Sequence, residues 1–202
     1  MREPLFTPAN RAPQLLEVGG DPNSVQDARE AAALHHATAL ALESAFTHGI
    51  DMPVGAVALR GAEIVGRGFA SDRRLGQPIL HAEVMSLFDT KFDVAGAVSG
   101  TVVTTLEPCT QCQDYLATQP GLTRVAFGLS RADAASRGLV NHHDETIFER
   151  ATRVSLPYEV VQVDDAHLRA VGLTILDNIW RDTGTGAIRV DTASLSLALA
   201  DY

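Results

Sequence analysis

Hydrophobic positions recur at helical spacing in the first quarter of the chain. The repeating positions are Val25, Ala28, Ala32, His35, Ala39, Leu42 and Phe46. Ser24 followed by Asp27 resembles a capping box, so the pattern predicts a helix from about Val25 to His48. His35 falls on the repeating stripe and is predicted to be a packed, hydrogen-bonded core residue rather than a ligand.

Two short apolar runs follow this helix. Residues 54–59 and 64–69 flank the tight turn at Arg60-Gly61, which predicts a β-hairpin. After His81 the apolar positions return to helical spacing, and they predict a second helix at Val84, Leu87 and Phe88.

The second half of the chain alternates strands with helices. The predicted elements are a buried strand at 101–105, a helix opening at Cys109, strands at 124–127 and 158–163, and a helix from about Asp165 to Arg181. Residues 130–150 form a polar segment between them. This alternation implies an α/β sandwich.

The two ends differ from the middle of the chain. Residues 1–23 contain four prolines, which predicts an irregular N-terminal extension, and residues 24–182 are predicted to form one domain. Residues 183–202 form a C-terminal tail in which the alternation from Ser194 to Leu197 is strand-like. This tail is expected either to pair with a sheet edge or partner subunit, or to pack loosely.

Composition narrows the class of protein. Hydrophobic residues make up 46% of the chain and charged residues 20%, which is typical of a soluble globular protein. No export signal or membrane span is visible, so we expect a cytoplasmic location and no membrane partner. The formal net charge of −9 makes nucleic acid a less favoured partner than a small molecule, because nucleic acid is bound largely through Lys and Arg.

The chain has two cysteines, Cys109 and Cys112, which must bind metal, act in redox chemistry or be incidental. Their spacing places both thiols on one face of a first helical turn, and Pro108 suits a helix start. Together with His81 they supply the three protein ligands of a catalytic zinc site, which keeps its fourth position for water. The unpaired amides of that turn favour thiolates at neutral pH.

His81 and Glu83 must lie in the opening turn of their helix, because residues two apart point to nearly opposite sides of an established helix. There the imidazole can reach a metal while the carboxylate leans over the bound water. Zinc lowers the pKa of such a water from about 15.7 toward roughly 7. Glu83 can then take the proton and return it to a leaving nitrogen.

These residues resemble the signature of the zinc-dependent cytidine/deoxycytidylate deaminase superfamily. Its HxE and PCxxC elements correspond to His81-Ala82-Glu83 and Pro108-Cys109-Thr110-Gln111-Cys112. The flanks at 53–57 and 105–109 are similar to those of the tRNA adenosine deaminase and guanine deaminase branch. The resemblance covers roughly Val25 to Arg181.

The resemblance implies a three-layer α-β-α sandwich with a mixed sheet of about five strands. The two ligand-bearing helix N-termini would face each other beneath the hairpin. It further implies Zn²⁺ as cofactor, Glu83 as general acid/base, release of ammonia, and a homodimer. Main-chain groups near Ala56 and Ala82 would line the substrate pocket.

The chain departs from this branch at positions that bear on the substrate. Ala70 stands where relatives usually carry an asparagine that contacts the base or sugar, and Gln113, Asp114 and Tyr115 replace small residues after the second cysteine. Residues 142–144 fall in a segment that in relatives often closes over the pocket, although an exposed polar turn is the simpler expectation. Trp180 is predicted to be a core residue or a subunit contact.

The sequence therefore predicts a zinc-dependent hydrolytic deaminase acting on a free nucleobase or nucleoside, guanine-like or cytosine-like. Adenosine deamination in tRNA or other nucleic acid is the first alternative, and a non-catalytic, zinc-stabilised binding subunit is the second. A thioredoxin-like dithiol would use the two cysteines but leaves His81 and Glu83 unexplained.

Overall fold

The computed structural model describes residues 14–16, 22–49, 51–90, 100–140, 145–182, 185 and 187–200. Its main sheet has the strand order β1-β3-β2-β4-β5-β6. The strands are β1 Gln14–Leu15, β2 Gly55–Arg60, β3 Glu63–Phe69, β4 Gly100–Leu106, β5 Leu122–Leu129 and β6 Glu159–Gln162. Strand β2 runs antiparallel to β3 and β4, whereas β4, β5 and β6 are mutually parallel. The prediction of a mixed sheet of about five strands is confirmed, with the two-residue β1 added at its edge.

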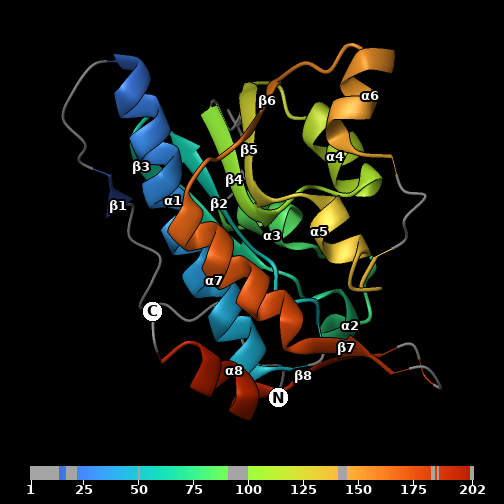
Figure 1. Ribbon diagram of the computed structural model, residues 1–202. Helices are drawn as coiled ribbons and strands as arrows, with labels where there is room; N and C mark the ends of the chain where they lie inside the picture. The colour runs from blue at the N-terminus through green and yellow to red at the C-terminus, as the bar shows by residue number, and fades with distance from the viewer. Residues whose placement is uncertain are drawn as a thin grey trace.

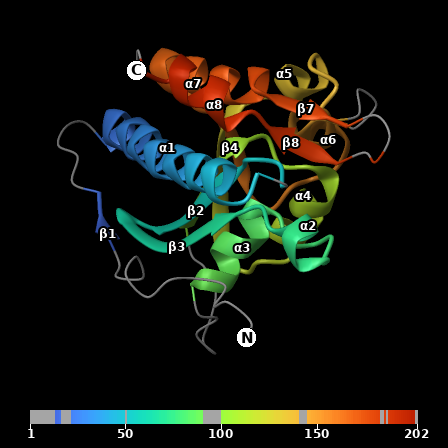
Figure 2. The same cartoon turned by 90° about the horizontal axis from the view of Figure 1, so that it is seen from below.

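Helices cover both faces of this sheet (Figure 1). Helices α1 (Pro22–Thr47) and α7 (Ala166–Asp177) lie on one face, and α3 (Ala82–Asp89) and α4 (Thr110–Ala117) lie on the other. The view from below separates the three layers, with α1 and α7 above the sheet and α3 beneath it (Figure 2). The predicted α-β-α sandwich is therefore confirmed.

Alternating side chains of the strands explain why both faces are covered, because successive residues of a strand point to opposite sides. One apolar cluster joins strand residues to α1 and α7, and includes Val57, Val103, Ala126, Leu34 and Leu168. The other joins the neighbouring strand positions to α3 and α4, and includes Ala58, Val102, Phe127, Leu87 and Leu116. Each face of the central strands thus has its own apolar core.

Glycines let two helices lie directly against the hairpin. A Cβ on Gly55 would lie 2.0 Å from the backbone oxygen of Ala37 in α1. On the other face, Cβ atoms on Gly66 and Gly68 would lie 2.1 Å from the Ser86 oxygen and 2.3 Å from the Ser86 nitrogen of α3. Only glycine allows these backbone contacts, so the sequence of β3 sets how closely α3 approaches the sheet.

The first helix is confirmed, but the prediction for His35 is wrong. Its side chain is exposed, and its ring centroid lies 6.2 Å from that of His167 on α7. The buried face of α1 is formed instead by Ala33, Leu34, Ala37 and Ala41. Alanines occur on several faces of this helix. The hydrophobic repeat therefore predicted a buried face about one residue away from the one that the structure shows.

The polar segment 130–150 contains α5 (Arg131–Ala135) and the start of α6 (Ile147–Arg153), two helices that the hydrophobic pattern missed. Each opens with a capping box, formed by Ser130 with Asp133 and by Thr146 with Glu149. This capping pattern was the available signal.

The chain after α7 also differs from the prediction. Helix α7, predicted to reach Arg181, ends at Asp177, and β7 (Ile179–Arg181) then pairs with β8 (Ile188–Val190) in a separate two-stranded sheet. Residues 194–197, predicted to be strand-like, lie in α8 (Thr192–Ala198), because Asp191 accepts a hydrogen bond from the Ser194 amide and caps a helix. Trp180 is half exposed and is not a core residue of the described chain.

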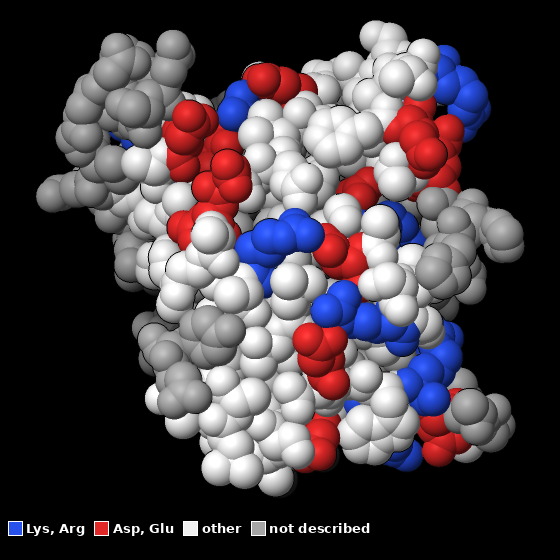
Figure 3. Space-filling view, in the orientation of Figure 1, with Lys and Arg blue, Asp and Glu red and all other residues white. Residues whose placement is uncertain are grey.

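On the face seen in Figure 3, acidic and basic side chains are interspersed over the described residues. Within the part of the chain that the structure describes, no helix is both long and apolar enough to cross a bilayer. The division into an extension, a domain and a tail stays a prediction.

Candidate metal centre

His81 and Cys109 occupy equivalent positions at the starts of α3 and α4. Each is the N-cap residue of its helix, with extended backbone angles of −75° and 164° for His81 and −69° and 164° for Cys109. Neither side chain accepts a capping hydrogen bond. The two helix starts therefore present side chains that are not used in capping, next to amides that favour negative ligands.

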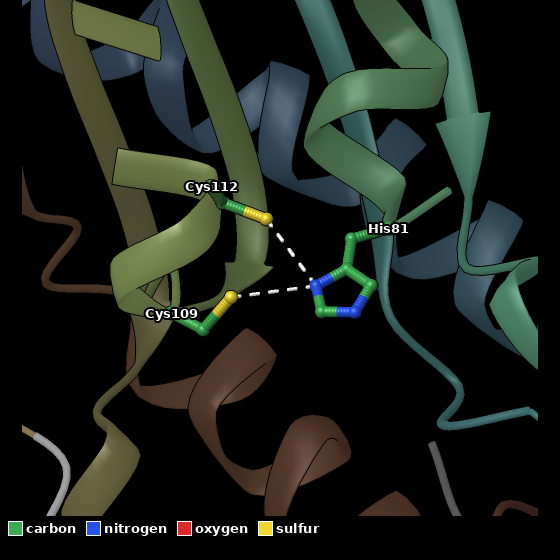
Figure 4. A group of neighbouring side chains, drawn as sticks. All are labelled: His81, Cys109 and Cys112. Atoms are coloured by element: carbon green, nitrogen blue, oxygen red, sulfur yellow. Dashed lines mark hydrogen bonds between the residues drawn. The ribbon is translucent and has the colours of Figure 1, made fainter. Parts of the chain in front are cut away.

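Three potential ligands point toward one another from these two helices (Figure 4). The Sγ atoms of Cys109 and Cys112 lie 3.4 Å and 3.3 Å from Nδ1 of His81. The ligand atoms all lie within 4.8 Å of one another. The structure brings the three predicted ligands together and identifies Nδ1 as the ligand nitrogen of His81.

The distances between these atoms fit zinc. With Zn–S near 2.3 Å and Zn–N near 2.1 Å, a tetrahedral ion holds nitrogen and sulfur ligands about 3.6 Å apart. The observed separations of 3.3 Å and 3.4 Å are within a few tenths of an ångström of that value. Two thiolates and an imidazole are also the donors that zinc prefers. His81, Cys109 and Cys112 are therefore placed to bind the metal.

Without the metal, the ligands would share their protons unequally. Hydrogen bonding from Cys112 lowers the pKa of Cys109 to about 4, and hydrogen bonding to Cys109 raises the pKa of His81 to about 9. The same hydrogen bond from Cys112 to Cys109 raises the pKa of the Cys112 thiol. Cys109 is thus already a thiolate, whereas His81 and Cys112 must lose protons when zinc binds.

Glu83 is the second residue of α3, two residues after His81. It is almost completely buried, with 4% of its surface exposed. Its Oε2 atom is 3.4 Å from Sγ of Cys112, so the carboxyl group lies directly beside the ligand set. Burial raises its pKa above the ordinary value for a glutamate. The sequence placed both His81 and Glu83 in an opening turn, and the structure has them there.

The ligand set lies at a cavity of about 180 Å³, equivalent to about six water molecules. The ligand end of the cavity is formed by His81, Ala82, Glu83 and Cys109. The apolar wall consists of Met52, Val54, Ala70, Leu106, Leu139, Val140 and Ile188. Charged lining residues are Asp72, Arg73, Glu107, Arg131 and Arg181. The cavity is thus lined by apolar and by polar or charged residues in similar number, and small-molecule sites combine an apolar wall with polar groups that orient the ligand.

Of the two residues predicted to contact substrate, the structure places one at the cavity. Ala82 lines the cavity, whereas Ala56 is fully buried in β2 and is not among the described lining residues. Their roles as substrate contacts stay predictions. Ala70, the position where relatives usually carry asparagine, does line the cavity. Residues 142–144 lie outside the described residues.

Glu107 is a site residue that the sequence analysis did not single out. Its buried carboxylate accepts hydrogen bonds from the backbone amide of Arg131 at 2.8 Å and from that of Ile147 at 2.5 Å. One side chain therefore joins the end of β4, next to the ligand Cys109, to the starts of α5 and α6. A glutamate directly after a buried strand was the signal for this role.

A zinc ligand set at two facing helix N-termini, with a buried carboxyl group beside it, defines a zinc-binding α/β protein of the deaminase type. The sequence model of the cytidine and deoxycytidylate deaminase zinc-binding region matches residues 28–129, and the chain belongs to this family. The predicted zinc cofactor and family are therefore confirmed.

Relatives lie in the predicted branch of the family. The tRNA-specific adenosine deaminase of Streptococcus pyogenes serotype M1 is 26% identical over 133 residues, which cover 65% of this chain and 72% of that protein. A second streptococcal protein of that name, from serotype M18, is 30% identical over 77 residues, or 37% of this chain and 46% of its own length.

A solved structure of guanine deaminase from Nitrosomonas europaea has a TM-score of 0.61 at 15% identity, covering 87% of this chain and 94% of that one. A structure from a study of tRNA:A34 deaminases has a TM-score of 0.53 at 17% identity, covering 65% and 97%. At these identities the two structures show the shared fold alone.

Proposed function

We propose that this protein is a hydrolytic deaminase that removes an exocyclic amino group from a free nucleobase or nucleoside, guanine-like or cytosine-like. The observation that carries the proposal is the buried Glu83 carboxyl group beside the His81, Cys109 and Cys112 ligand set, at the end of a cavity. Zinc, when bound there, acts as a Lewis acid that makes a water molecule nucleophilic at neutral pH.

Residues of the chain transfer the proton, exclude water and orient the substrate. Glu83 takes a proton from the attacking water and delivers it to the leaving amino nitrogen, which departs as ammonia. Burial raises its pKa above the ordinary value for a glutamate, and a shift in this direction favours the protonated form that the second step needs. The apolar wall excludes bulk water, and main-chain groups near Ala82, which lines the cavity, orient the ring.

A small substrate is supported by charge and by the size of the cavity. The net charge of −9 disfavours a polyanion, and acidic and basic side chains are interspersed on the face seen in Figure 3. The cavity of about 180 Å³ is small compared with drug-sized pockets of roughly 300–1,000 Å³. Solved relatives of the same fold have been studied in complex with 8-azaguanine and with 2,6-diaminopurine.

The competing function is adenosine deamination in tRNA. It is favoured by the names of the curated relatives, which are tRNA-specific adenosine deaminases. A non-catalytic binding subunit is disfavoured by the presence of Glu83, because a subunit that uses zinc only for stability does not require a buried carboxyl group beside the ligands.

Ammonia release from a panel of free bases, nucleosides, single-stranded RNA and tRNA tests the proposal. The zinc-loaded protein is expected to carry about one zinc per chain and to release ammonia from at least one base or nucleoside. Activity on folded tRNA alone would replace the small-molecule proposal with the tRNA alternative. Light scattering of the same preparation tests the expected homodimer.

A further inference from the structure

The β7–β8 hairpin, which lies beyond residues 28–129, contributes a wall to the cavity. Arg181 of β7 and Ile188 of β8 are cross-strand partners, and both line the cavity beside the metal ligands. The neighbouring pair, Trp180 and Arg189, lies on the other face of the same hairpin and is exposed. The hairpin thus presents one apolar and one cationic side chain to the cavity.

Arg181 is held in place without being neutralised by its contact. One of its terminal nitrogens donates a hydrogen bond to the carbonyl oxygen of Leu139 at 2.6 Å, and Leu139 itself lines the cavity. A carbonyl oxygen accepts one donor but carries no charge, so the guanidinium keeps its positive charge and further N–H groups. The side chain is exposed, which places it where the cavity meets solvent.

The lining of the cavity also includes three acidic residues, Asp72, Glu83 and Glu107. Both carboxylate oxygens of Glu107 already accept backbone amides, and Glu83 lies beside the ligand cysteines. Two more arginines line the same cavity, Arg73 on α2 (Asp72–Leu75) and Arg131 on α5. Arg181 is therefore one of three arginines, from three different elements, that line the cavity together with the three acidic residues.

We propose that Arg181 binds an anionic group of the substrate, a carboxylate or a phosphate, at the mouth of the cavity. The planar guanidinium fork matches both groups, because each presents two oxygens at the spacing of its N–H donors. This inference rests on the proposed deaminase function and changes its expected substrate from a neutral base or nucleoside to a small heterocycle that carries such a group.

Equilibrium binding tests the proposal separately from turnover. Calorimetry with the zinc-loaded Glu83→Gln protein compares matched neutral and anionic probes: cytosine with 5-carboxycytosine, cytidine with its 5′-monophosphate, and guanosine with its 5′-monophosphate. The carboxylate pair and the phosphate pairs distinguish the two anions. We expect at least one anionic probe to bind about 10- to 100-fold more tightly than its neutral partner, as a charge-assisted hydrogen bond allows.

Adding Arg181→Gln should remove most of this preference while leaving the affinity for the neutral probe within about twofold. Arg189→Gln is the matched control, since it removes the same charge from the other face of the hairpin and should leave the preference intact. Arg181→Lys keeps a charge and should retain part of the preference, which separates recognition from loss of the Leu139 contact.

Equal affinity for every neutral and anionic pair would overturn the proposal, as would the absence of binding by any anionic probe. If Arg181→Gln lowered the affinity for the neutral and the anionic probe of a pair by the same factor, Arg181 would have only a structural role in the cavity wall, and the proposal would be wrong. Failure of the deaminase function would appear differently, as zinc-loaded protein that binds probes but releases no ammonia from the wider panel.

Discussion

Replacing Gly68 with alanine should damage the metal centre, because the new side chain would displace α3. A Cβ atom at this position would lie 2.3 Å from the Ser86 nitrogen and 2.4 Å from the Ala82 oxygen, and both are backbone atoms of α3. Ordinary contact begins at about 3.4 Å, so the helix start would have to move by about 1 Å. Because His81 and Glu83 are in that helix start, the movement would displace a ligand and the carboxyl group together.

The size of the effect follows from this displacement. Overpacking a well-filled site costs about 1–3 kcal/mol of unfolding free energy. A misplacement of about 1 Å at a reacting centre can lower the rate by about 100-fold. We therefore expect Gly68→Ala to fold with reduced stability, to bind zinc more weakly and to lose about two orders of magnitude in ammonia release. Urea unfolding, metal titration and single-substrate kinetics measure the three effects.

Gly61→Ala is the matched control, because Gly61 lies in the turn of the same hairpin and a Cβ there meets no atom within 4 Å. Its φ of +61° disfavours alanine, so this variant should lose about 1 kcal/mol of stability and keep the activity of the wild type. A Gly68→Ala protein with wild-type zinc affinity and turnover would refute the argument that β3 sets the position of the site.

Three further outcomes follow from the contacts of the centre. Glu107→Gln should lower the unfolding free energy by about 2 kcal/mol in urea titration, because the glutamine side chain has one acceptor oxygen for two buried backbone N–H groups. The control is Glu159→Gln on the surface, which should lower it by less than about 1 kcal/mol. Equal losses would contradict this. Zinc affinity should rise with pH between about 6 and 9, because His81, with a pKa of about 9 in the metal-free protein, and Cys112, whose pKa is raised, must both lose a proton, whereas Cys109 is a thiolate above about pH 4. Competition titrations that show a flat affinity between pH 6 and 8 would be inconsistent with this proton balance. Chelation should lower the thermal midpoint of the wild type, measured by calorimetry, and added zinc should restore it; an unchanged midpoint would show that the metal does not stabilise the fold.

The central sheet and the ligand set could be predicted from sequence because their signals are local. The residues of the hairpin alternate around a short turn, and the spacing of Cys109 and Cys112 fits one turn of helix. The starts of α3 and α4 face each other only after the sheet has formed, and the motif resemblance supplied that long-range information.

The rest of the site depends on contacts that no local pattern encodes. The hydrophobic repeat missed α5 and α6, because these helices are short and are stabilised by capping boxes and by Glu107. Arg181 was expected at the end of a helix, but α7 ends at Asp177 and the chain returns as a hairpin beside the cavity. Which side chains line a cavity depends on tertiary packing, and sequence spacing does not report it.

The most direct test of the account is the turnover of zinc-loaded Glu83→Gln. Glutamine has nearly the same size as glutamate but cannot carry the proton, so the variant should keep about one zinc per chain and lose ammonia release by about 10²- to 10⁴-fold. Metal analysis on the same sample confirms that the ligands are still occupied. A zinc-loaded variant with wild-type turnover would remove Glu83 from the reaction and contradict the proposed mechanism.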